Sequence, residues 1–87
     1  MANKRQLKKQ INAMVIDVID ECIYIQEINS NQSEAAELLI EEVIATYNSL
    51  ISRVSKAKNK TDFRPIIKDF EEKSDLYLDK LNSLNKE

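Results

Sequence analysis

The feature that most restricts the fold of this chain of 87 residues is the complete absence of glycine. Tight hairpin turns between β-strands need backbone angles with positive φ, and glycine adopts these angles at the lowest cost. Hydrophobic residues make up 43% of the chain and charged residues 32%, a balance that suits a folded helical protein better than a disordered one. We therefore expect an all-α fold.

The most apolar segment, residues 11–28, predicts a helix that is buried on more than one side. Twelve of its eighteen residues are apolar and none is basic. A second apolar stripe, Ile16, Ile19 and Ile23, lies about a quarter to a third of a turn from the main one. The segment has strand propensity as well, but its length and its lack of internal turn residues favour a helix. The main stripe, which we expect to face the core, consists of Leu7, Ile11, Met14, Val15, Val18, Cys22 and Ile25.

Polar turn residues divide the chain into three predicted helices, over residues 4–28, 33–58 and 63–84. The first helix is expected to begin near Asn3 or Lys4, and three consecutive polar residues end it. Because the connections are short, neighbouring helices should run antiparallel. We therefore predict a single domain, residues 1–87, folded as an up-down-up antiparallel three-helix bundle.

The residue types at the helix starts predict how each helix is capped. Asn31 or Ser33 is expected to accept a hydrogen bond from a free N–H of the second helix. Thr61 or Asp62 is expected to do the same for the third helix. Pro65 should then lie in the first turn of that helix, where its missing N–H costs least.

The second and third predicted helices each carry apolar residues at alternating spacings of four and three. These spacings place one side chain per turn on a single face, which predicts the surface that packs into the core. The seam of the second helix is Ala36, Ile40, Val43, Tyr47, Leu50, Val54 and Ala57, broadened by Leu39, Ile44 and Ile51. The seam of the third helix is Phe63, Ile67, Phe70, Ser74, Tyr77, Leu81 and Leu84.

Charge is distributed unevenly along the chain. Residues 1–9 carry a net charge of +4, residues 10–52 carry −8 without one Lys or Arg, and residues 53–70 carry +4. In an up-down-up bundle the start of the first helix, the end of the second and the start of the third meet at one end. We expect an anion-facing patch at that end, formed by Lys4, Arg5, Lys8, Lys9, Arg53, Lys56, Lys58, Lys60, Arg64 and Lys68.

The residue types speak against catalysis, against a cofactor, against a metal site and against a small-molecule substrate. The chain has no histidine, so Cys22 lacks the usual base of a nucleophilic thiol, and its place in the core stripe predicts a structural role. Neighbouring carboxylates such as Glu41 and Glu42 point about 100° apart on a helix and serve most simply as a solvated face. We expect a non-catalytic protein without a membrane-spanning segment, and its lone cysteine is typical of the cytoplasm.

The start of the chain carries a resemblance to a known group of proteins. The residues Asn3-Lys4-Arg5, Leu7-Lys8-Lys9 and Ile11-Asn12 are followed by an apolar helix with Glu21-Cys22. This pattern, over residues 3–22, resembles the start of short, uncharacterised, all-helical bacterial proteins. The resemblance implies a bacterial cytoplasmic origin, and it implies no activity and no functional residue.

The second isoleucine stripe is the main candidate for function. Ile16, Ile19, Ile23 and the nearby Tyr24 would form an apolar patch of unusual size if they were exposed together on a monomer. One interpretation is that another helix of the same chain covers them. The other, which we favour, is a protein–protein interface, most simply with a second copy in a homodimer. The alternative function is a small nucleic-acid-associated protein that uses the basic residues, although the pI of about 5.2 and the lack of a recognised binding motif speak against it.

Overall fold

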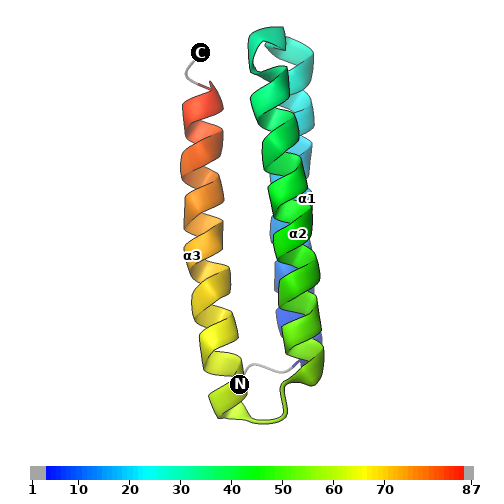
Figure 1. Ribbon diagram of the computed structural model, residues 1–87, viewed down its shortest axis with the longest axis vertical. Helices are drawn as coiled ribbons and strands as arrows, with labels where there is room; N and C mark the ends of the chain where they lie inside the picture. Colours follow the sequence, from blue (N-terminus) through cyan, green and yellow to red (C-terminus); the bar gives the residue numbers. More distant parts are fainter. Residues whose placement is uncertain (1–3, 86–87) are drawn as a thin grey trace.

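The computed structural model describes residues 4–85, which form three long helices (Figure 1). These are α1 (Lys4–Ile28), α2 (Ser33–Lys56) and α3 (Lys60–Asn85), with a short 3-10 turn, η1 (Ser30–Gln32), between the first two. They run up, down and up in an elongated bundle of 45 × 17 × 16 Å. The predicted all-α three-helix fold is confirmed. Asn3, one of the two expected helix starts, lies outside the described residues.

The core follows the predicted stripe of α1 closely. Every member of that stripe is buried except Met14, which is half-buried and packs against the core. On α2 the predicted seam is confirmed at most positions, but Ile40 and Tyr47 are only half-buried while Leu39 is buried. The buried face of α2 is therefore rotated slightly toward Leu39. All buried residues in the described chain belong to the apolar class.

The seam predicted for α3 is confirmed at Tyr77 and Leu81, which are buried, and differs from the structure in the first half of the helix. Phe63, Ile67 and Phe70 are only half-buried, and Ile66, which lies outside the predicted seam, is buried. The reason is geometric: α1 and α2 pack closely along their length, and α3 lies less tightly in the groove between them. The face of α3 that enters this groove is narrow, so the flanking seam residues remain partly in contact with solvent. Only Ile66, Tyr77 and Leu81 of α3 are buried.

Polar contacts at both ends hold α1 and α2 in register. At the start of α1, Lys4 donates from Nζ to the backbone carbonyl of Ser55 over 3.0 Å. At its other end, the Gln26 side-chain amide donates to the carbonyl of Ser33 at 3.1 Å and to Oε2 of Glu37 at 3.2 Å. The predicted side-chain cap at Asn31 or Ser33 is wrong, because η1 precedes α2 and Gln32, its N-cap residue, makes no side-chain capping bond.

The connection between α2 and α3 also differs from the prediction. Helix α2 ends at Lys56 because Ala57 has an extended backbone with ψ of 141°. Asn59 is the cap of α3: its Oδ1 accepts from the Asp62 N–H over 3.1 Å, while the Asp62 carboxylate accepts from the Lys58 N–H. The helix therefore begins at Lys60, and Pro65 lies in its second turn and not in its first.

Candidate protein interface

The four residues predicted to form an interface do not share one environment. Ile16 is 50% exposed, Ile23 44% and Tyr24 54%, whereas Ile19 is half-buried and packs against the core. Tyr24 follows Ile23 directly, so its side chain points about 100° away around α1 and leaves the stripe. The structure thus keeps three isoleucines on one face, two of them largely in solvent, and separates the tyrosine from them.

The hydrogen bond between Gln26 of α1 and Glu37 of α2 shows which side of the bundle this stripe occupies. Residues three and seven positions apart share a helix face. On α1, Ile23 and Ile19 lie three and seven positions before Gln26. On α2, Ile40 and Ile44 lie three and seven positions after Glu37. Since the helices are antiparallel, both series advance in the same direction along the bundle. The resulting isoleucine face consists of Ile16, Ile19 and Ile23 of α1 together with Ile40 and Ile44 of α2.

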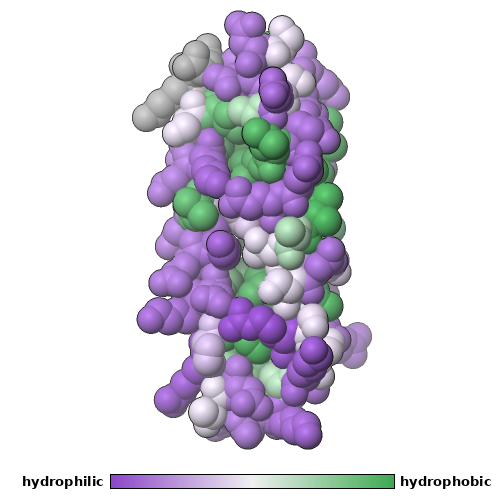
Figure 2. All heavy atoms as spheres, viewed as in Figure 1, coloured by the Kyte–Doolittle hydropathy of each residue, from purple (hydrophilic) through white to green (hydrophobic). Residues whose placement is uncertain are grey.

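The isoleucine face lies on the opposite side of the α1–α2 pair from α3. On α2, Glu42 and Thr46 bind side chains of α3, and each is two residues from Ile44, about 200° around the helix. Ile44 is 44% exposed and Ile40 is half-buried. In Figure 2 hydrophobic residues line the right-hand edge of the molecule, on the side away from α3. No described helix of the chain packs over this face.

Opposite charges flank the isoleucine face at its two ends. Toward the start of α1 and the end of α2, Arg5, Lys8 and Lys9 line a shallow hollow with Asn12, Tyr47 and Ile51. Toward the other end of the same two helices, α1 and α2 both carry exposed carboxylates. We call these the acidic end: Glu27, Glu34, Glu37 and Glu41.

All ten residues of the predicted anion-facing patch lie at one end of the bundle, at the starts of α1 and α3 and around the end of α2 (Figure 1). We call this set the basic end. At least two of its members have partners within the chain: Arg53 binds the carboxylate of Asp69, and Lys4 donates to the Ser55 carbonyl. Part of this positive charge therefore stabilises contacts between the helices.

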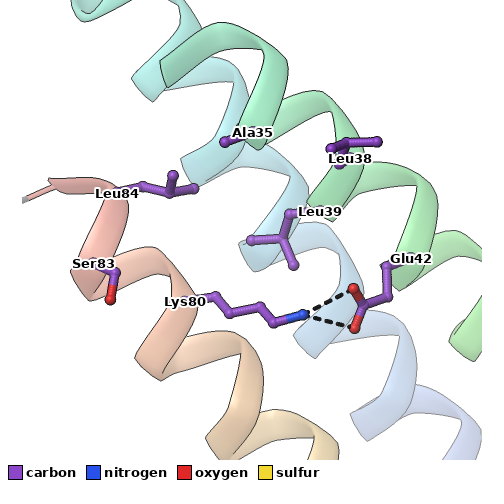
Figure 3. Close-up of a pocket in the computed structure, with 7 residues that line it drawn as sticks. All are labelled: Ala35, Leu38, Leu39, Glu42, Lys80, Ser83 and Leu84. Carbon is purple, nitrogen blue, oxygen red and sulfur yellow. Dashed lines mark hydrogen bonds and ion pairs between the residues drawn. The ribbon is translucent and has the colours of Figure 1, made fainter. Parts of the chain in front are cut away.

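A second apolar hollow lies between α2 and α3, and the sequence did not single it out. In Figure 3, Leu39 and Leu84 point into it, and Lys80 reaches across from α3 to Glu42 of α2. The Lys80 Nζ lies 2.9 Å and 3.0 Å from the two carboxylate oxygens. In Figure 2 a green area lies in the upper part of the molecule, where Figure 1 has the first turns of α2 and the last turns of α3. Leu38, which lines this hollow, is 62% exposed. The adjacent leucines at 38 and 39 were the only signal of it in the sequence.

The one thiol of the chain is shielded from reaction. Cys22 has no solvent exposure and forms no disulfide. Burial, with smaller contributions from the nearby charges of Glu21 and Glu37, raises the pKa of the Cys22 thiol from 9.0 to about 11. The thiol is therefore protonated at neutral pH, and the thiolate is the nucleophilic form.

No group of three or more metal-ligating side chains within residues 4–85 is arranged to hold a metal ion. None of the described helices is long and apolar enough to cross a membrane. The chain matches no protein-family model, no curated protein and no solved structure. The resemblance to short bacterial proteins stays a prediction.

Proposed function

We propose that this chain is a non-catalytic helical-bundle protein that works by protein–protein association, and that it associates first with a second copy of itself. The observation that carries the proposal is the exposure of Ile16 and Ile23 on a surface that Ile40 and Ile44 extend onto the next helix. Burial of such apolar side chains is the main favourable term in most protein association. We infer a cytoplasmic protein, in keeping with its free buried thiol.

The side of the bundle that carries the isoleucine face is large enough for a stable dimer. A side of the bundle measuring 45 by 17 Å offers on the order of 800 Å², which is about the area that each partner contributes to a standard protein interface. A bundle of 87 residues gains from such burial, because small domains remove a smaller fraction of their surface from water than large ones do. Association also adds stability by mass action.

The experiment that tests the proposal replaces exposed isoleucines with lysine. We expect the parent protein to have twice the chain mass of 10.1 kDa in light scattering. The variant Ile16→Lys/Ile23→Lys should have the mass of a monomer and keep its helical circular dichroism, because both side chains already contact solvent. The matched control is Leu38→Lys/Leu78→Lys, which adds the same charge at positions that are 62% and 58% exposed on other faces.

The control variant should remain dimeric. A monomeric parent protein would overturn the proposal, and so would equal dissociation of the control. An isoleucine variant that unfolds, while the control stays folded, would place the stripe in the core of the monomer and would also contradict the proposal.

A second candidate function, binding of nucleic acid, draws its support from the gathering of ten basic residues at one end of the bundle. Phosphate contacts by lysine and arginine give an affinity that falls steeply with salt. The test is retention of DNA and RNA by the purified protein, with reversal of charge at Lys8, Lys9, Lys56 and Lys58. Salt-dependent retention that is lost in this variant would favour nucleic-acid binding over self-association as the role of the basic end.

A further inference from the structure

We propose that the two copies pair antiparallel, with the two-fold axis lying in the interface and perpendicular to the helices, so that each α1 lies against the partner's α1 running the opposite way. This inference rests on the self-association proposed above and specifies its geometry. What points to it is the order of side chains along the isoleucine face, which runs from an acidic end through a central apolar patch to a basic end.

Two symmetric dimers can be built on one elongated face. A two-fold axis parallel to the helices brings α1 against the partner's α2 and places basic end over basic end. A two-fold axis perpendicular to the helices brings α1 against the partner's α1 and places basic end over acidic end. Interfaces of the first kind set like charges opposite one another, and complementary charge is what selects orientation and suppresses wrong partners. The charge order of this face is therefore compatible with the second arrangement alone.

The apolar residues fit the same axis. The contacts of Lys4 with Ser55 and of Gln26 with Glu37 set the level of each α2 residue against α1. By that register, Ile44 lies level with the middle of α1, between Ile16 and Ile19. An axis at this level sets Ile44 against Ile44 of the partner subunit and Ile16 against Ile19 of the partner subunit. Isologous contacts of this kind are what a two-fold interface requires.

The charges at the edges of the face then meet in pairs. Lys9 and Glu27 lie eighteen residues apart on α1, which is five turns, so they share its outer edge. Their midpoint is residue 18, next to the proposed axis, and the rotation sets Lys9 against Glu27 of the partner subunit. Each dimer has this pair twice.

Cross-linking distinguishes the two orientations directly. Cys22 is buried and serves as an unreactive background, so cysteines introduced at exposed positions are the only accessible thiols. A mixture of Lys9→Cys and Glu27→Cys proteins, treated with a short bifunctional thiol reagent, should give a mixed covalent dimer. A mixture of Lys9→Cys and Ser52→Cys proteins is the matched control, since these positions meet only when the axis is parallel to the helices. It should give little product.

Reversal of charge tests the same geometry without cross-linking. Lys9→Glu should weaken the dimer, raising its Kd roughly tenfold at low salt, and Glu27→Lys should do the same. The chain with both changes keeps the net charge of the parent and restores the pair in inverted form, so its Kd should return to near the parent value. Raising salt to about 0.5 M should weaken the parent dimer, because the Debye length falls to a few Å.

The outcomes separate this inference from the proposed function. A dimer that needs Ile16 and Ile23 but gives the Lys9–Ser52 cross-link, or that tightens as salt is raised, overturns the antiparallel geometry and leaves self-association standing. A monomeric parent overturns both. If the charge variants lose nucleic-acid retention while the dimer is unchanged, the basic residues serve another ligand and the inference is wrong.

Discussion

Tyr77 of α3 donates a hydrogen bond from its hydroxyl to Oγ1 of Thr46 on α2, over 2.5 Å, while its ring has no solvent exposure at all. The contact joins α3 to the α1–α2 pair, and among the buried residues of α3 it is Tyr77 that carries a polar group. Burial of the ring raises the pKa of the Tyr77 hydroxyl, so it remains a donor well into the alkaline range. The hydrogen bond therefore helps to fix the position of α3.

Removal of this hydroxyl should destabilise the protein modestly. We expect Tyr77→Phe to lower the free energy of unfolding by about 1 kcal/mol, the net worth of a typical intramolecular hydrogen bond. Thr46→Val should cost a similar amount, and the double variant about the same as either one, because both remove the same contact. Chemical denaturation of the three variants measures this. Strictly additive losses would mean that the two hydroxyls act independently.

The cap of α3 gives a second prediction. Asn59→Ala removes the side-chain oxygen that accepts from the Asp62 N–H, and it should cost about 1 kcal/mol. Asn31→Ala is the matched control in the other connection, where the N-cap residue of α2 makes no side-chain capping bond, and it should change stability by less than about 0.5 kcal/mol. Equal losses in thermal or denaturant unfolding would contradict the assignment of Asn59 as the cap.

Neighbouring isoleucines on α3 test the position of its buried face. Ile66 is 3% exposed and Ile67 is half-buried. Ile66→Ala should cost about 2–5 kcal/mol, the usual range for an isoleucine truncated in a core, and Ile67→Ala clearly less. Denaturant midpoints at equal m-values provide the comparison. The reverse order would restore the seam that the sequence predicts.

The thiol of Cys22 should make stability depend on alkaline pH. Its pKa in the folded protein is about 11, against 9.0 for the unperturbed group, so between these values the unfolded chain releases a proton that the folded chain keeps. The stabilisation is fully present below pH 9 and is lost as pH rises toward 11. Unfolding measured from pH 8 to 11 in the parent and in Cys22→Ala isolates this contribution, since the alanine variant should lack it.

The reactivity of the same thiol offers a control on the folded state. A thiol-specific chromogenic reagent should react slowly with native protein at pH 8 and rapidly after unfolding in denaturant, because the Cys22 side chain has no exposed surface. Rapid reaction of the native protein would mean that α1 separates readily from its neighbours.

The sequence predicts α1 well because its stripe faces two neighbours at once and is therefore wide and strongly apolar. It predicts α3 less well, since Phe63, Ile67 and Phe70 are as hydrophobic as Ile66, and only the position of the groove decides which of them is buried. The caps were misassigned for a local reason: Asn59, Thr61 and Asp62 are all good capping residues, and the extended backbone at Ala57 selects the first.

The isoleucine face shows the same limit. Spacing along one helix identifies Ile16, Ile19 and Ile23 as a stripe. Spacing along the next helix places Ile40 and Ile44 in an apolar seam. That both sets border one surface depends on the register between α1 and α2, which the Gln26–Glu37 contact sets. Periodicity describes one helix at a time, so the combined surface emerges only once two helices are placed together.

The loose seating of α3 has a consequence for motion. α1 buries six residues and α2 five, but α3 only three, and it adjoins hollows on both of its flanks. Segments with few buried contacts open at lower free energy than the rest of a structure. Backbone amides of α3 should therefore exchange with deuterium ahead of those at the centres of α1 and α2, through openings in which the helical hairpin stays closed. The protein then consists of a stable α1–α2 hairpin and a third helix that detaches and rebinds more often than the hairpin opens.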